Sequence, residues 1–236
     1  MKLYYDTVST PLLSILRKLM SSEVFQDFRL VGGTALALQR GHRRSVDIDL
    51  FTDLDYSDMP VAAMREYLEK EFPVHKGTES MNMPANGYHI LLSEGQEPPI
   101  KADFFYTEPF IFPAIEEEGL RIADQREIAA MKLGVIGNQI LRQKDFWDVH
   151  DLLEDYSLSE MIQWALQRDP YSFTKEDIIK GLQQVDQVQE SPLGIVSLKP
   201  LSYWELKVLD LMEEVKGIQS YDKNNVPEAC NGIHSR

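Results

Sequence analysis

The feature that most constrains the fold of this 236-residue chain is a pair of glycines between a short apolar run and a helix-forming run. Residues 28–31 (FRLV) predict a strand, and the alanines and leucines of residues 34–38 predict a helix. Gly32 and Gly33 therefore lie at a strand-to-helix turn. The first N–H groups of a helix bind phosphate, and glycine lets a ligand approach the backbone closely. The segment predicts a phosphate-binding turn.

Two aspartates on the next strand follow this turn closely. Residues 46–51 (VDIDLF) alternate apolar and acidic positions, so Asp47 and Asp49 share one face of a strand. Asp-x-Asp alone is common on exposed strands, but only thirteen residues lie between Gly33 and Asp47. Two like charges this close need a proton or a cation to offset their repulsion, and carboxylate oxygens suit Mg²⁺. We therefore expect Asp47 and Asp49 to bind metal beside the glycine turn.

Asp103 is a third candidate metal ligand. It lies among apolar residues in a strand expected over residues 99–106. Three carboxylates can hold two metal ions, of which one activates an attacking hydroxyl and the other holds a triphosphate. Asp103 is then also the group that accepts the hydroxyl proton. Taken alone, it is equally well explained as a strand-end acid that faces water.

The remaining pattern predicts an α/β chain with a mixed sheet, flanking helices and a mainly helical second half. We expect a sheet-containing core over residues 1–123, a helical domain over 124–220 and a flexible tail over 221–236. Asp124 and Glu127 resemble a capping box at the start of the helical half. Further helices are expected at residues 9–19, 60–72, 124–136, 145–156, 159–168, 174–185 and 202–216, and further strands at 74–79 and 88–93.

Composition excludes several classes of protein. A hydrophobic fraction of 43% and a charged fraction of 26% are ordinary for a globular chain. There is no signal peptide core or apolar run of membrane-spanning length, so we expect a cytoplasmic protein without membrane contact. The only cysteine, Cys230, excludes an internal disulfide and a cysteine-rich zinc site. The zinc-hydrolase, P-loop and dinucleotide-binding motifs are also absent.

The charge balance bears on the partner. The formal net charge of −14 is opposite in sign to that of a protein that holds nucleic acid by its phosphates. A nucleic-acid substrate would need a local basic patch. Arg40, Arg43 and Arg44 form such a basic run just before the acids, where they meet a triphosphate or an RNA end, or else lie in a solvated loop.

Two blocks of sequence resemble the AbiEii toxin-type nucleotidyltransferases, a family of the polymerase-β-like superfamily. The first block contains residues 31–36 (VGGTAL), then 41–45 (GHRRS) and 47–51 (DIDLF). The second contains residues 128–133 (IAAMKL) and 144–149 (KDFWDV). The resemblance covers about residues 28 to 160, with a looser helical match beyond.

The resemblance implies a nucleotidyltransferase fold that uses Mg²⁺ and a nucleoside triphosphate (NTP). It also implies the toxin of a type IV toxin–antitoxin pair, encoded with a DNA-binding antitoxin. By position, the family pattern assigns nucleotide binding to Gly32, Gly33, Thr34, Arg43 and Ser45, metal binding to Asp47 and Asp49, and catalytic roles to Lys132, Asp145 and Asp148. Asp103 joins them as the third metal ligand and catalytic residue on the argument given above.

Three positions in the helical half leave alternatives open. Lys132 follows Ile128 by one helical turn, so it reaches into a cleft or remains an exposed lysine with its stem on an apolar face. Lys144 and Asp148 have the spacing of an ordinary helix-surface ion pair. Asp145 is the better functional candidate of that block.

An arginine common in relatives is missing. Gln139 and Ile140 fall in that region, and Arg142 is only nearby. This leaves open how the helical half engages the nucleotide or the acceptor.

The leading functional prediction is Mg²⁺-dependent transfer of a nucleoside monophosphate from NTP to an acceptor, either tRNA or a protein. One alternative is a small-molecule nucleotidyltransferase of the antibiotic-modifying type, which the acidic charge favours over an RNA substrate. The other is a catalytically silent binding module with the same fold. The joint presence of Asp47, Asp49, Asp103 and Lys132 opposes the silent module.

Overall fold

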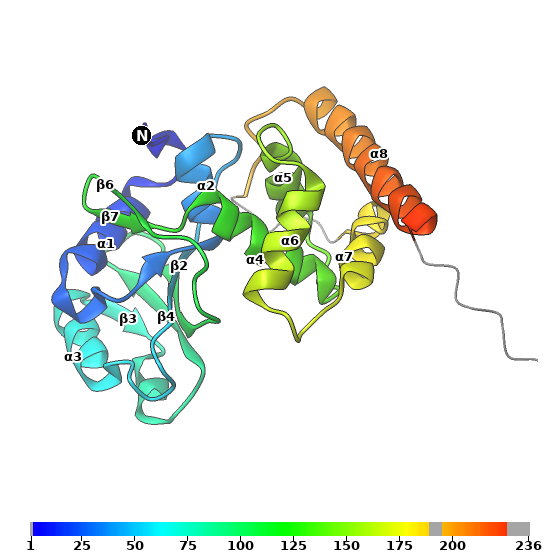
Figure 1. Cartoon of the computed structure of the whole chain (residues 1–236). Helices are drawn as coiled ribbons and strands as arrows, with labels where there is room; N and C mark the ends of the chain where they lie inside the picture. Colours follow the sequence, from blue (N-terminus) through cyan, green and yellow to red (C-terminus); the bar gives the residue numbers. More distant parts are fainter. Residues whose placement is uncertain (1, 189–194, 226–236) are drawn as a thin grey trace, which may run out of the picture.

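The computed structural model describes residues 2–188 and 195–225. A sheet with its helices forms the first half of the chain, and a group of helices forms the second half (Figure 1). This arrangement confirms the expected α/β class with a mixed sheet followed by a mainly helical part. No helix in the described ranges is both long enough and apolar enough to cross a membrane.

The sheet has seven strands in the order β3-β4-β5-β2-β1-β7-β6. It is mixed, because β2 runs parallel to β5 and β1 runs parallel to β7, while the other neighbours are antiparallel. The strands are β1 (Arg29–Leu30), β2 (Ile48–Thr52), β3 (Val74–Lys76), β4 (Gly87–Ser93), β5 (Ile100–Tyr106), β6 (Ile115–Glu117) and β7 (Leu120–Ile122). The central strands β2 and β5 therefore lie side by side, with their functional residues in register.

Eight α-helices accompany the sheet in the described part of the chain. Their apolar sides and one face of the sheet form a continuous hydrophobic core. They are α1 (Thr10–Ser21), α2 (Gly32–Arg40), α3 (Val61–Glu71), α4 (Gln125–Gly137), α5 (Gln143–Leu152), α6 (Leu158–Arg168), α7 (Lys175–Leu182) and α8 (Leu201–Asn225). Short 3₁₀ turns lie at Tyr5–Thr7, Glu23–Phe25, Thr78–Asn82 and Val185–Gln187.

The expected capping box at the start of α4 forms only in part. Asp124 caps the helix, because its carboxylate accepts a hydrogen bond from the backbone N–H of Arg126 at 2.9 Å. Glu127 does not complete the box. Its buried carboxylate instead accepts the backbone N–H groups of residues 111 and 112 and pairs with Arg168 of α6 at 2.7 Å. Glu127 thus joins the sheet half to the helical half.

The hairpin of β6 and β7 was not predicted from the sequence. Each strand has three residues, which is too short to show a period of two. The connecting residues Glu118 and Gly119 both have positive φ, at 49° and 79°. Two positive φ values in a two-residue loop are typical of the type I′ hairpin turn.

Helix α8 is longer than expected and continues to Asn225. The predicted tail boundary at residue 221 therefore falls inside a helix, and residues 226–236, with Cys230, lie outside the described part of the chain. The helix packs against α5, where Trp204 stacks on Trp147 at 5.8 Å between ring centroids. This contact places the start of α8 on the helical half, beside α5 (Figure 1).

Two glycines provide a test of helix packing. A side chain at Gly181 of α7 would lie 2.4 Å from the carbonyl oxygen of Ile136 in α4, whereas a side chain at Gly217 of α8 would meet nothing within 4 Å. We expect Gly181→Ala to destabilise the protein by about 1–3 kcal/mol through overpacking. The control, Gly217→Ala, should stabilise it by up to about 1 kcal/mol through helix propensity. Chemical denaturation measures both, and equal effects would contradict the α4–α7 packing.

Candidate active site

A cavity of about 310 Å³ opens where the start of α2 meets the sheet and the helical half. It brings together the glycine turn, acids from the sheet and cations from α4 and the start of α5. Its lining residues are Val31, Gly32, Gly33, Asp47, Asp49, Phe51, His89, Lys101, Asp103, Phe105, Met131, Lys132, Val135, Arg142 and Lys144.

The three predicted metal ligands converge in this cavity. Asp49 of β2 and Asp103 of β5 are direct partners in the parallel register, and Asp47 precedes β2 on the same face. Burial and then the negative charge of Asp103 raise the pKa of Asp49 from 3.8 to about 6, and Asp47 adds to this shift. Burial and the neighbouring carboxylates therefore disfavour the ionised form of Asp49 more than Lys132 and Lys144 favour it.

Gly32 is required by its backbone and by its neighbour. Its φ is +65°, in the left-handed region that favours glycine, and a side chain there would lie 2.7 Å from Oδ2 of Asp49. The preceding N–H, of Val31, donates to the carbonyl oxygen of Asp49 at 2.9 Å. The turn therefore holds the start of α2 directly against the acidic strand.

Gly33 makes room for Arg43. A side chain at Gly33 would lie 2.1 Å from Nη2 of Arg43. The guanidinium of Arg43 is fully buried and binds the carboxylate of Asp148 with two hydrogen bonds, Nε to Oδ1 at 2.6 Å and Nη2 to Oδ2 at 2.8 Å. Arg43 is predicted to bind nucleotide, but it donates these hydrogen bonds to α5 and to the backbone oxygen of Arg44.

Asp148 is the centre of a buried network. Besides Arg43, it contacts Nε2 of His42 and Nζ of Lys132, each at 2.7 Å. Although burial raises the pKa of Asp148, the charges of Arg43 and Lys132 hold it well below its usual value. Lys132 also binds Asp145 at 2.6 Å.

Lys132 is therefore not an exposed lysine. Only 7% of its side chain is exposed, and it lines the cavity. Burial lowers its pKa, but Asp145 and Asp148 raise it, and the net pKa lies above the ordinary value. The ammonium of Lys132 remains charged at the cavity wall, held by two carboxylates of α5.

Thr34 and Ser45 are buried under the glycine turn. The hydroxyl of Thr34 donates to the carbonyl oxygen of Asp47 and lies 2.9 Å from the hydroxyl of Ser45. Both side chains thus fix the backbone that leads into the acidic strand. They do not line the cavity predicted to hold nucleotide.

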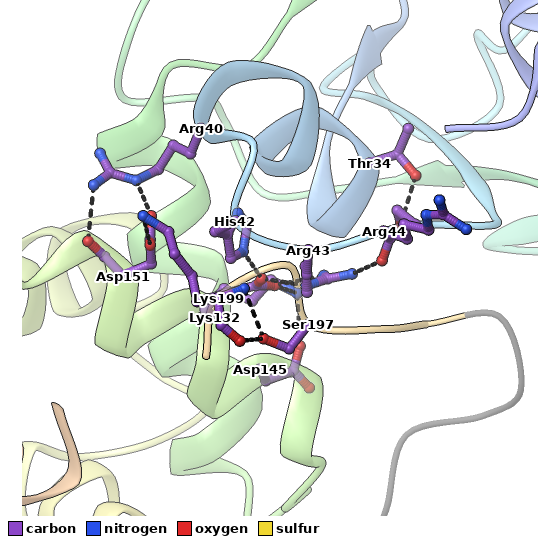
Figure 2. Close-up of polar contacts among 12 residues, drawn as sticks. Thr34, Arg40, His42, Arg43, Arg44, Lys132, Asp145, Asp151, Ser197 and Lys199 are labelled. Atoms are coloured by element: carbon purple, nitrogen blue, oxygen red, sulfur yellow. Dashed lines mark hydrogen bonds and ion pairs between the residues drawn. The ribbon is translucent and has the colours of Figure 1, made fainter. Parts of the chain in front are cut away.

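The predicted basic run does not face a ligand as a unit. Arg40 points to the helical half, where it pairs with Asp151 and Asp155 (Figure 2). Arg43 is buried on Asp148, and only Arg44 is exposed. Arg40 and Arg43 therefore connect α2 and the following loop to α5.

The short segment just before α8 packs on the loop between α2 and the acidic strand. The backbone N–H of Arg44 donates to Val196 at 2.7 Å, and the N–H of Leu198 donates to His42 at 2.9 Å. The hydroxyl of Ser197 accepts the indole N–H of Trp204 at 2.5 Å. The segment that leads into α8 thereby helps to position the loop before the acids, and Figure 2 shows its Ser197 beside Arg43.

The interpretation of Lys144 and Asp148 as a helix-surface pair is wrong. Asp148 is buried in the network described above and is not exposed on the helix surface, and Lys144 lines the cavity. Lys144 makes no ion pair with any residue that the structure describes. Burial and the charges of Lys132 and Arg142 lower its pKa.

Arg142 reaches the same cavity, where its Nε binds Asp145 at 2.5 Å. It brings a guanidinium to the helical wall, although the chain lacks the arginine expected in the region of Gln139 and Ile140. Gln139 instead donates to the carbonyl oxygen of Asp177 at the start of α7.

Two partners of Asp103 were not identified from the sequence. Nδ1 of His89 lies 2.8 Å from Oδ1 of Asp103, and the ammonium of Lys101 binds Oδ2. Lys101 shares the face of Asp103 by the alternation of β5, which is visible in the sequence. His89 lies opposite Asp103 only through the pairing of β4 with β5.

The donor set fits a divalent cation of the Mg²⁺ type. Three carboxylates line one cavity, and burial together with the charge of Asp103 makes the ionised form of Asp49 unfavourable there. Although all three carboxylates line the cavity, no three acidic, histidine or cysteine side chains within residues 2–188 and 195–225 lie close enough together in this arrangement to hold an ion. Both oxygens of Asp103 are engaged here, one by His89 and the other by Lys101.

Comparison with known proteins gives three similarities. The family model described as "Nucleotidyl transferase AbiEii toxin, Type IV TA system" matches residues 14–192. An uncharacterized protein of Aquifex aeolicus (strain VF5) is 26% identical over 203 residues, which cover 80% of this chain and 87% of that protein. The crystal structure of an antigenic nucleotidyltransferase-like protein from Paracoccidioides brasiliensis is 16% identical, with a TM-score of 0.47, over 91% of this chain and 94% of the other.

The raised pKa of Asp49 predicts how stability depends on pH in metal-free protein. Above about pH 6 the folded state carries an unfavourable charge at Asp49, and below about pH 4 the carboxyl is protonated in both states. Asp49→Asn should therefore raise the free energy of unfolding at pH 7.5 by about 1–3 kcal/mol. The gain should vanish as the pH falls from 6 to 4.

Urea denaturation with a chelator present measures this dependence. The control is Asp58→Asn, an exposed aspartate in the loop before α3, which should change stability little at either pH. A destabilising effect of Asp49→Asn at pH 7.5 would contradict the assigned repulsion.

Proposed function

This chain belongs to the AbiEii nucleotidyltransferase toxin family, and from that membership we propose that it moves a nucleoside monophosphate from an NTP to an acceptor hydroxyl. The observation that carries the proposal is one cavity lined by the glycine turn, Asp47, Asp49 and Asp103. Phosphoryl transfer needs positioned phosphates and compensated charge more than it needs covalent chemistry. The glycine turn can position the phosphates, and the three aspartates can hold the cation that compensates their charge.

The start of α2 is the proposed phosphate site. The free N–H groups at Gly32 and Gly33 and the helix dipole favour an anion at this point. Lys144 supplies a further positive charge that no described carboxylate has neutralised. The triphosphate would lie between the glycine turn and α5.

Asp47, Asp49 and Asp103 would hold Mg²⁺. When bound, Mg²⁺ neutralises the phosphates and makes the acceptor hydroxyl more acidic. Asp103 would take the hydroxyl proton on a carboxylate oxygen, after its contacts with Lys101 and His89 are released. The attacking oxygen then displaces pyrophosphate from the α-phosphorus of NTP.

The remaining predicted site residues position these groups. Lys132 lines the cavity and is proposed to contact phosphate oxygens directly. Asp145 and Asp148 orient its ammonium, and Arg43 fixes Asp148 against the glycine turn. Thr34 and Ser45 hold the backbone of the acidic strand from beneath. Apart from Lys132, these are positioning residues rather than ligands of the nucleotide.

The biological role is proposed from the family. The chain would act in the cytoplasm as the toxin of a type IV pair, with a DNA-binding antitoxin encoded nearby and tRNA or a protein as acceptor. The net charge of −14 also supports a second candidate function, modification of a small molecule of the antibiotic type. Labelled NTP, incubated with RNA, protein and aminoglycoside acceptors in parallel, discriminates between them. A catalytically silent module would label none of them.

Mg²⁺ and NTP should stabilise the protein together by more than the sum of their separate effects, because the triphosphate supplies metal ligands that the carboxylates lack. A ligand at one hundred times its Kd adds about 2.7 kcal/mol, which raises the Tm of a chain of this size by roughly 5–10 °C. Asp47→Asn should lose this joint shift and also abolish transfer. An equally large NTP shift in chelator would show that nucleotide binds without the metal site.

Lys144 provides a separate test of the phosphate site. Lys144→Gln should weaken NTP binding by about 10- to 100-fold, because a charge-assisted hydrogen bond is lost. The matched control is Lys70→Gln, since the Lys70 side chain is 78% exposed on α3. Isothermal titration with the Mg²⁺ complex of NTP measures both variants. Wild-type affinity in Lys144→Gln would place the triphosphate elsewhere.

A further inference from the structure

Three rings form a continuous aromatic surface beside the acids. The centroid of Phe105 in β5 lies 5.7 Å from that of Phe51 in β2 and 4.9 Å from that of His89 in β4. All three line the active-site cavity, and 64% of the His89 side chain is exposed. We call Phe51, Phe105 and His89 the aromatic shelf.

The position of Phe105 is fixed by the strand beside it. Phe105 pairs with Gly87 of β4, and a side chain at Gly87 would lie 2.3 Å from a carbon of the Phe105 ring. The ring therefore occupies the space above the glycine. Phe105 is only half-buried and is not part of the hydrophobic core of the described residues. Its placement against Gly87 is explained by packing, but its exposure toward the cavity is not.

Phe51 and Phe105 lie one step along their strands from the acids, while His89 pairs with Asp103 itself. Asp49 pairs with Asp103 and Phe51 pairs with Phe105 in the same register. Residues two apart on a strand are about 7 Å apart and face the same side. A planar group on the shelf would thus lie within one nucleotide's length of the reacting centre.

The shelf and the glycine turn lie on different sides of the acidic strand. The turn follows β1, whereas the shelf extends across β2, β5 and β4, and the sheet order places β1 and β5 on opposite sides of β2. The molecule that approaches Asp103 from β5 therefore meets the shelf. The triphosphate, bound at the turn, approaches from the other side.

We propose that the aromatic shelf is a stacking site for a nucleobase. Bases stack on aromatic side chains with little dependence on sequence, and an unpaired base has two faces available. The apolar side chains of Met131 and Val135 line the same cavity, so a planar ring would also meet an apolar wall. The inference rests on the proposed nucleotidyl transfer and extends it to a base-binding subsite.

The base comes either from the NTP or from the end of an RNA acceptor. The placement of the shelf beyond Asp103 favours the acceptor, since the base would then belong to the molecule that carries the attacking hydroxyl. A single unpaired nucleotide in the cavity is compatible with an acidic chain, because it needs few phosphate contacts. The two sources are distinguished by which base-containing probe, the NTP or the RNA, loses affinity when the shelf is altered.

The test compares Phe105→Leu with wild-type protein in equilibrium binding with Mg²⁺. The three probes are tripolyphosphate, which lacks a base, the four NTPs, and a single-stranded RNA tetranucleotide. Stacking on one ring corresponds to about a 5- to 150-fold difference in affinity. Phe105→Tyr keeps a ring and should restore binding, and Tyr171→Ala removes an aromatic side chain that is 95% exposed elsewhere and should change nothing.

We expect Phe105→Leu to weaken tetranucleotide binding at least fivefold while tripolyphosphate and NTP affinities stay unchanged. Loss confined to NTP would keep the shelf as a base site but assign it to the donor. Unchanged affinity for both base-containing probes would overturn the proposal. A melting temperature of Phe105→Leu near that of wild type shows that the variant is folded, and Phe51→Leu provides an independent variant of the same shelf.

These outcomes separate the shelf from the proposed function. Wild-type protein that binds Mg²⁺-tripolyphosphate, together with unaltered base binding in Phe105→Leu, overturns only the shelf. Wild-type protein that binds none of the three probes overturns nucleotidyl transfer and the shelf together. Weakened binding of tripolyphosphate itself in Phe105→Leu would show general damage to the cavity and would also contradict stacking.

Discussion

The buried carboxylate of Asp148 joins the two halves of the molecule. It belongs to α5, yet it binds Arg43 and His42 from the loop after α2 and Lys132 from α4. Two positive charges share it in a largely buried setting, so removing it would leave the guanidinium of Arg43 without its carboxylate in a medium that solvates it poorly. Together with the contacts of Glu127 and Arg40, this group fixes how the helical half lies on the sheet. The cavity between them depends on that orientation.

The network also explains which charges remain available to a ligand. Asp145 and Asp148 form ion pairs with Lys132, Arg142 and Arg43 within the protein. On the sheet side, Asp49 has no such partner, and its pKa rises to about 6 because of burial and its acidic neighbours. Lys144 stands opposite with a lowered pKa. The cavity thus places buried carboxylates of the sheet opposite a lysine of α5, the charges that a cation and a phosphate chain would meet.

The residues of the family motif have different roles in this structure. Its residues do not all contact a ligand, because several hold the others in place. Gly33 is small to admit the guanidinium of Arg43. Thr34 fixes the backbone of Asp47. The polar residues of the motif therefore include both those that would contact the ligand and those that hold the first group in position.

The sequence by itself determined the local units. The glycine turn at Gly32, the shared face of Asp47 and Asp49, and the order of most helices and strands follow from φ requirements and from periods of 2 and 3.6 residues, which act between neighbours in the chain. Only the tertiary structure decided the partners. It buried Asp148 rather than exposing it, turned Lys144 to the cavity, and brought His89 to Asp103, because these contacts depend on strand pairing and helix packing between residues far apart in the chain.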